Sequence, residues 1–162
     1  MTSLLRTLVP AMLLCAATAG AFASGPVGND SEAAADPDAC APRVVEGWLR
    51  SPPMPMPMMA GFARIENPCA TGVEIVSAHS DAFASVELHE TRVVDGVSRM
   101  REVPRLAVAA DGEAVLQPGG LHLMLMRPVA PLQSGGSARV EFTLADGRSI
   151  GADFEVRAAN AR

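Results

Sequence analysis

The chain has 162 residues, with 13 Lys and Arg against 18 Asp and Glu and a formal net charge of −5. An acidic protein without a basic cluster binds nucleic acid or an anionic membrane surface poorly, so we exclude both classes of partner. No stretch approaches the roughly 20 consecutive apolar residues of a transmembrane helix, and we expect no membrane span.

The first 23 residues are typical of a signal peptide that is cleaved on export. Arg6 precedes an apolar run from Leu8 to Ala19, and Ala-Phe-Ala at 21–23 supplies the small side chains that signal peptidase requires. Lipid attachment at Cys15 is less favoured, because the bulky Leu14 stands before it. We therefore expect cleavage after Ala23 and a location in the periplasm.

The remaining chain divides into a leader, one domain and a tail. Residues 24–39 offer little to bury and are predicted to be a disordered leader. Residues 40–158 form one domain of ordinary size, followed by a short tail at 159–162. Cys40 and Cys69 are the only cysteines after Cys15. In an oxidising compartment the two are expected to form a disulfide, with a pair of metal thiolates as the alternative.

The domain is predicted to be all-β, because short alternating apolar runs are separated by turn residues and no window shows a long amphipathic helix. The expected strands lie near 43–50, 60–66, 72–79, 84–94, 97–103, 113–117, 121–127, 138–145 and 148–156. Turn signals fall at 95–96, 118–120, 134–136 and 146–147. Many short strands at this spacing indicate an antiparallel β-sandwich or barrel.

Proline and methionine alternate between Ser51 and Met59, which predicts an extended loop that cannot join a central strand. Met54, Met56 and Met58 share one side of this loop, and Met59 follows them. The chain has nine methionines, and the soft, neutral thioether suits cuprous copper. The loop is interpreted as a second Cu(I) site, a flap, a surface for a partner, or an apolar loop without chemistry.

Two later segments combine histidine with methionine. If Asp95 and Gly96 form a two-residue turn, Thr91 faces Met100 and His89 faces Glu102. His89 and Met100 are then diagonal neighbours on one face of the sheet, about 7–8 Å apart at Cα. A register slip of one residue would place them on opposite faces.

The second segment is residues 121–126, where alternation sends His122, Met124 and Met126 to the same face. His122 and Met124 lie roughly 7 Å apart along the strand, close enough to share one ion. The preceding Pro-Gly-Gly turn puts His122 near the start of a strand, at a rim that a partner could reach. Met126 lies further from the rim and is expected in the core.

These four side chains form the candidate metal site: His89, Met100, His122 and Met124. We expect this site to hold one copper ion per chain. The ion should be Cu(I), because Cu(II) prefers harder nitrogen and oxygen ligands in a tetragonal arrangement. Four neutral ligands bind less tightly than thiolates would, which suits a carrier that must release its ion.

The spacing of the four ligands resembles the metal motif of the PCuAC-type periplasmic copper chaperones: His, ten residues, Met, twenty-one residues, His, one residue, Met. The surrounding segments 87–90, 100–104 and 116–126 are also similar to that family, and the likeness extends from about Val44 to Val156. It implies a cupredoxin-like or immunoglobulin-like β-sandwich. It also implies that copper is delivered to a copper-accepting subunit of a respiratory oxidase or to an assembly protein.

Two features depart from the family pattern. Thr91 occupies a place where many members carry a further methionine. Residues 156–162 contain no His or Met, so we do not expect the His- and Met-rich tail of some members. The loop at 54–59 is a candidate substitute for that tail.

Three other functions compete with this interpretation. A blue-copper electron carrier needs two His, a Cys thiolate and a weak axial Met, whereas both mature cysteines lie outside the His89–Met124 segment. An enzyme is not expected, because neither Gly-x-Ser-x-Gly nor Cys-x-x-Cys occurs. A metal-free β-sandwich interaction module is the third. His79 is expected to be an ordinary histidine, Trp48 a core or edge aromatic, and the protein a monomer.

Overall fold

The computed structural model describes residues 40–54 and 56–161, and these residues contain strands and turns but no helix. No helix that could cross a membrane is therefore present among them. The expected signal peptide at 1–23 and the leader at 24–39 lie outside the described residues.

Ten strands make up the domain, and nine of them coincide with the strands expected from the sequence. They are β1 (Arg43–Arg50), β2 (Met58–Asn67), β3 (Val73–His79), β4 (Phe83–Val94), β5 (Val97–Glu102), β6 (Leu106–Val108), β7 (Gly112–Leu116), β8 (Leu121–Pro128), β9 (Ser137–Leu144) and β10 (Ser149–Arg157). β6 was not expected, because three residues are too few to show a strand period. It forms because its backbone pairs with β3 from Val73 to Ile75.

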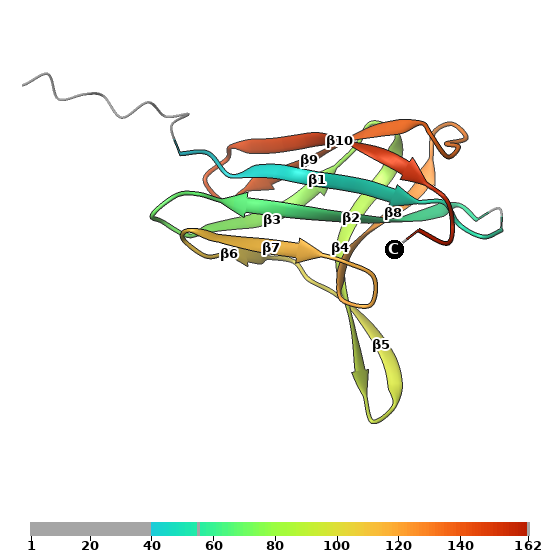
Figure 1. The fold of residues 1–162 in the computed structure, drawn as a ribbon, viewed down its shortest axis with the longest axis horizontal. Helices are drawn as coiled ribbons and strands as arrows, with labels where there is room; N and C mark the ends of the chain where they lie inside the picture. The colour runs from blue at the N-terminus through green and yellow to red at the C-terminus, as the bar shows by residue number, and fades with distance from the viewer. Residues whose placement is uncertain (1–39, 55, 162) are drawn as a thin grey trace, which may run out of the picture. The chain divides into compact units, whose positions relative to one another are not determined.

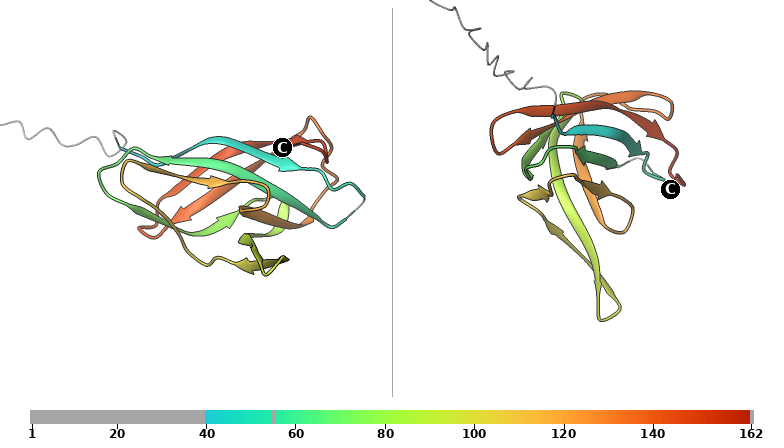
Figure 2. Two further views of the ribbon diagram at one scale, coloured as in Figure 1. Left: turned by 60° about the horizontal axis from the view of Figure 1, so that its bottom comes forward. Right: turned by 60° about the vertical axis from the view of Figure 1, so that its left-hand side comes forward.

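The strands form one strongly curved sheet in the order β5-β4-β8-β2-β1-β10-β9-β3-β6, with β7 paired to one half of β2. A further pairing, Ala78 in β3 with Val86 in β4, brings the sheet back on itself. The result is the barrel-like sandwich seen in Figures 1 and 2, from which the β4–β5 hairpin projects as an arm. The all-β prediction is therefore confirmed.

One pairing differs from the antiparallel prediction. β1 and β10 run parallel, with Trp48 opposite Glu155 and Arg50 opposite Arg157. The first and last strands need no short turn between them, so turn geometry does not force them to be antiparallel.

The core lies on the inner face of the curved sheet. Leu123 and Leu125 of β8 are fully buried, as are Leu49 of β1 and Phe154 of β10. Trp48 is also buried and packs against Phe62, with ring centroids 4.4 Å apart. Because side chains alternate along a strand, burial of the β8 leucines turns its histidine and methionines to the other face.

The methionine loop is shorter than expected. β2 begins at Met58, whose strand partner in β8 is Met126, and Met59 is paired with Leu125. No proline follows Pro57 in this segment, so the backbone N–H groups from Met58 onward are free to pair with β8. Met59 is only 5% exposed and belongs to the core, which makes its assignment to the loop wrong.

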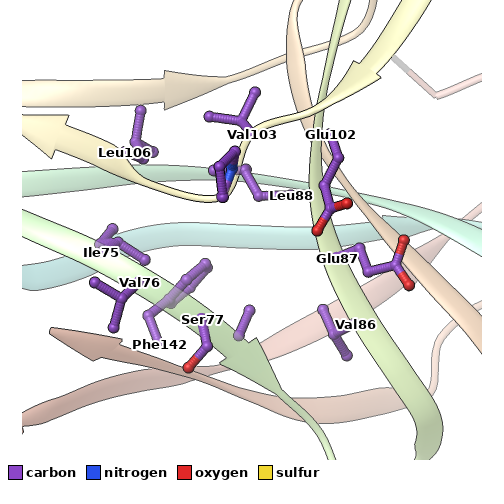
Figure 3. A pocket seen from close by; sticks show the side chains of 12 residues that line it. Ile75, Val76, Ser77, Val86, Glu87, Leu88, Glu102, Val103, Leu106 and Phe142 are labelled. Atoms are coloured by element: carbon purple, nitrogen blue, oxygen red, sulfur yellow. The ribbon is translucent and has the colours of Figure 1, made fainter. Parts of the chain in front are cut away.

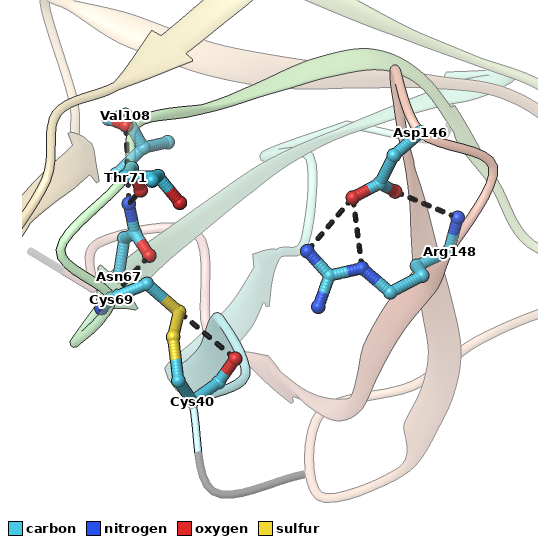
Figure 4. A network of polar contacts seen from close by, with 7 residues as sticks. All are labelled: Cys40, Asn67, Cys69, Thr71, Val108, Asp146 and Arg148. Carbon is cyan, nitrogen blue, oxygen red and sulfur yellow. Dashed lines mark hydrogen bonds and ion pairs between the residues drawn. A yellow bond between two sulfur atoms is a disulfide. The ribbon is translucent and has the colours of Figure 1, made fainter. Parts of the chain in front are cut away.

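A disulfide joins Cys40 to Cys69, as expected, and a buried amide organises the chain beside it (Figure 4). Asn67 is 1% exposed, and its Nδ2 donates to the carbonyl oxygens of Thr71 and Ala109, both at 2.9 Å. Its Oδ1 accepts from the backbone N–H of Cys69 at 3.2 Å. One side chain therefore holds the cysteine loop and the segment after β6 together.

Replacing Asn67 with alanine is expected to lower the free energy of unfolding by about 2–3 kcal/mol, because buried carbonyl groups lose their donor. Urea denaturation followed by tryptophan fluorescence measures the change. The exposed Asn160 provides the matched control, and Asn160→Ala should leave the midpoint in place. Equal midpoints for the two variants would contradict this role for Asn67.

Candidate metal centre

The β4–β5 hairpin has the register expected from its turn. His89 is opposite Glu102, and Thr91 is opposite Met100. Asp95 and Gly96 both adopt positive φ, at 53° and 77°, as a tight two-residue hairpin turn requires. His89 and Met100 are therefore diagonal neighbours on one face of the sheet.

The β4–β8 pairing brings the two histidine segments together. His89 is directly opposite His122, and Glu87 is opposite Met124. The imidazole ring centroids of the two histidines are 6.1 Å apart. Directly opposite residues share a face, so both histidines, Met100 and Met124 lie on the same side of the sheet.

The four side chains differ in their access to solvent. His122 is buried, at 7% exposed, whereas Met100 on the projecting arm is 55% exposed. The sequence predicted that the site is open to a partner at His122. In the structure, Met100 is the exposed ligand instead. Met126 is half-buried on the face of Met124 and lies outside the core cluster, so its assignment to the core was wrong. Its strand neighbours are Met58 and Ser85, neither of which is fully buried.

Each imidazole uses one ring nitrogen in a hydrogen bond. Nδ1 of His122 lies 2.9 Å from the carbonyl oxygen of Gly120, and only the nitrogen can donate there. Nε2 of His89 lies 3.1 Å from a carboxylate oxygen of Glu87. In the neutral rings, the lone pairs are therefore on Nε2 of His122 and Nδ1 of His89. In metal-binding histidines the ring nitrogen that does not bind the metal typically makes such a hydrogen bond, which sets the orientation of the ring.

Nδ1 of His89 is the one buried side-chain nitrogen or oxygen among the described residues that has no hydrogen-bond partner. A buried polar atom without a partner costs free energy. A metal ion bound to this lone pair would remove that cost, so the ring is suited to hold one.

Charged side chains stiffen the base of the arm that carries Met100. Glu90 contacts Arg92 at 2.7 Å and Arg101, its partner across the hairpin, at 2.6 Å. The hydrogen bond from Arg92, with a further one from Arg101, holds the pKa of the Glu90 carboxyl below its usual range. Glu90 thus stays charged and links the strand of His89 to the strand of Met100.

A hollow of about 180 Å³ lies beside His122 and Met124, bordered by Arg50, Phe62 and Thr91. The Arg50 guanidinium stands over the Phe62 ring, 5.1 Å from its centroid. A second cavity, of about 130 Å³, lies between β3, β4 and Phe142 and contains none of the four predicted ligands. Figure 3 shows Glu87 and Glu102 at one end of it and apolar side chains at the other.

The described residues contain no group of three or more His, Cys, Asp and Glu side chains arranged to hold a metal. His79 is exposed and its Nε2 lies 3.0 Å from Asp81, as expected of an ordinary surface histidine. The partners of the imidazoles, Glu87 and Gly120, were not predicted from the sequence. Glu87 stands two residues before His89 in β4, a spacing that places both side chains on the same face. Gly120 lies just before β8 and bonds to His122 through its backbone carbonyl oxygen.

The family described as "Putative lipoprotein LpqE-like" matches residues 43–156, nearly the whole described domain. The chain belongs to this family. A curated relative, "Putative lipoprotein Lxx21020" of Leifsonia xyli subsp. xyli, is 35% identical over 91 residues, which are 56% of this chain and 55% of the relative. The chain thus spans about half the length of that relative.

Solved structures similar to this LpqE-like domain include PCuAC domains. The copper-bound PCuAC domain from PmoF2 superposes with a TM-score of 0.60 at 17% identity, covering 72% of this chain and 92% of that one. The CuI form of DR1885 from Deinococcus radiodurans gives 0.59 at 27% identity, covering 73% and 80%. The resemblance to PCuAC domains expected from the sequence is confirmed in the fold.

Proposed function

We propose that this LpqE-like protein is a periplasmic copper chaperone. It binds one Cu(I) through His89, Met100, His122 and Met124 and performs no catalysis. It delivers the ion to a copper-accepting subunit of a respiratory oxidase or to an assembly protein. The relatives of similar fold include domains described as copper-bound and CuI-bound, which supports a copper cargo.

The observation that carries the proposal is the direct cross-strand pairing of His89 with His122. It sets two imidazoles on one face with Met124 two residues along β8. Two neutral nitrogens and two thioethers suit Cu(I) better than Cu(II). Unlike cysteine, none of the four ligands has a thiol that must be deprotonated before it binds the ion. None of them can form a disulfide in an oxidising compartment.

The exposure of Met100 fits a carrier that exchanges its ion. Met100 is the outermost of the four ligands, on an arm whose other apolar residues, among them Val93 and Val97, are also exposed. A partner's ligand can displace this thioether first, while the buried His122 still holds the ion. The disulfide also argues against a blue-copper carrier, because Cys40 and Cys69 bind each other and provide no thiolate.

Titration of the reduced, oxygen-free protein with Cu(I), followed by X-ray absorption at the copper edge, tests the ligand set. We expect one tightly bound ion per chain, with nitrogen and sulfur neighbours in comparable numbers. A first shell of nitrogen and oxygen alone, or the absence of saturable binding, would overturn the proposal. Absence of binding would instead favour a metal-free interaction module.

Export is tested by mass spectrometry of the N-terminus of the processed protein. We expect the mature chain to begin at Ser24, because residues 21–23 carry the cleavage signal. The family and the curated relative are both described as lipoproteins, which points to Cys15 as the competing start. A diacylated N-terminal cysteine would replace the periplasmic soluble form with one anchored to a membrane.

A further inference from the structure

A second group of methionines lies next to the proposed copper site. Met56, Met58 and Met124 line one hollow of about 170 Å³, together with Arg50 and the prolines at 52 and 53. Met56 comes from the segment before β2, Met58 from the first residue of β2, and Met124 from β8. Met59 also borders this hollow, but it is 5% exposed and belongs to the core. Three methionines outside the core, from two segments of the chain, thus border one hollow.

Strand register explains why these side chains meet. Met124 is opposite Ala60, and Met126 is opposite Met58. Met58 and Met124 are therefore diagonal neighbours on the same face, about 7–8 Å apart at Cα, which long side chains can bridge. Met54 is 66% exposed and does not line the hollow, although it belongs to the same proline-methionine segment.

Met124 belongs to both neighbouring hollows. It lines the one with Met56 and Met58, and it also lines the one with His122 and Phe62. Arg50 and Ala60 are shared as well, so the two spaces adjoin along β8. Met124 therefore borders both spaces.

We propose that Met56, Met58 and Met124 form a second, weaker binding station for Cu(I), from which the ion passes to the histidines. This inference rests on the proposed function, because Met124 is one of the four ligands of the main site. Met124 keeps its bond to the ion while Met56 and Met58 are exchanged for imidazole nitrogens. No oxidation change and no proton transfer are required, because all ligands are neutral.

The surroundings of the station favour brief occupancy. Three thioethers without a nitrogen ligand offer fewer strong donors than the main site. The positive Arg50 side chain borders the hollow and opposes a resident cation. The prolines restrict the backbone of the segment, so Met56 loses little conformational freedom when it binds.

Silver(I) titration of protein labelled with ¹³C at the methionine methyl groups tests the station. The variant His89→Ala/His122→Ala removes both imidazoles, so binding that persists there is due to thioethers. We expect the methyl resonances of Met56, Met58 and Met124 to shift together and to saturate. The resonance of Met54 should stay in place. Equal shifts at Met54 and Met56, or no saturable shift, would overturn the inference.

Substitutions in the same background measure the contribution of the segment. Met56→Leu/Met58→Leu should weaken silver(I) binding at least roughly tenfold, about 1.4 kcal/mol of binding free energy. Met54→Leu is the matched control and should leave the affinity as it was. Unchanged affinity in the double leucine variant would count against the station.

A second measurement needs no change to the histidines. Stopped-flow transfer of Cu(I) from a coloured chelator should be slowed by Met56→Leu/Met58→Leu and not by Met54→Leu. Unaltered transfer rates in the double variant would overturn the relay.

Silver(I) titration of the unaltered protein, followed by NMR of both the imidazole and the methionine methyl resonances, separates the two proposals. Shifted imidazole resonances without shifts at Met56 and Met58 would reject the second station alone. Shifts of the Met56 and Met58 methyl groups without imidazole shifts would reject the main site and leave the second station standing.

Discussion

Replacing His122 with alanine is expected to weaken Cu(I) binding by roughly a hundredfold or more, since even the loss of an outer-shell partner of a metal ligand costs about 10–100-fold. His122 is the most buried of the four proposed ligands, and Gly120 holds its ring through Nδ1. Its removal leaves His89 without its cross-strand partner. Competition with a chromogenic Cu(I) chelator, free of oxygen, measures the change.

His79 supplies the matched control for this variant. It is the one other histidine in the sequence, is exposed, and its Nε2 lies 3.0 Å from a carboxylate oxygen of Asp81. His79→Ala should therefore bind Cu(I) as the unaltered protein does. Because His122 is buried, its variant must first show native circular dichroism and cooperative unfolding. Folded His122→Ala with unaltered affinity would contradict the ligand assignment.

Removing the disulfide with Cys40→Ser/Cys69→Ser is expected to lower the free energy of unfolding by roughly 3–4 kcal/mol. The two cysteines are 29 residues apart, and a loop of this length restricts the unfolded chain by about that amount. Urea denaturation measures the difference. A reducing agent should destabilise the unaltered protein equally and leave the double variant as it is.

The same variant separates stability from copper binding. The disulfide lies near Asn67 at the end of β2, whereas Met58 and Ala60 beside the proposed site lie at its start. A strand of this length spans about 30 Å, so the bridge does not contact the ligands. The folded variant should bind Cu(I) with its original affinity. Loss of affinity together with unchanged stability would contradict both statements.

The sequence was most informative where the structure is local. Alternation located nine of the ten strands, because the period of two is a property of each strand by itself. The Asp95-Gly96 turn determined the β4–β5 register. Both residues adopt positive φ, as a two-residue hairpin turn requires, and a loop of this length fixes which residues of the two strands are paired. The pairing of Cys40 with Cys69 followed from the number of cysteines left after the expected cleavage.

Where partners come from distant parts of the chain, the sequence was less informative. The three-residue β6 exists through its pairing with β3, and Met59 is buried because β2 pairs with β8 one residue after the last proline. Met126 lies outside the core although its face was predicted correctly, because its strand neighbours Met58 and Ser85 do not bury it fully. These pairings and burials depend on distant partners and not on a local period.

By itself, then, the amino-acid order determined the strands, the hairpin turn and the residue types suited to a soft metal ion. Only the tertiary structure decided that His89 stands opposite His122, and that Met124 adjoins both the histidines and the Met56–Met58 pair. The physical reason is that β4, β8 and β2 are neighbours through non-local backbone pairing. That pairing depends on burying the whole core at once, and no single segment of the sequence specifies it.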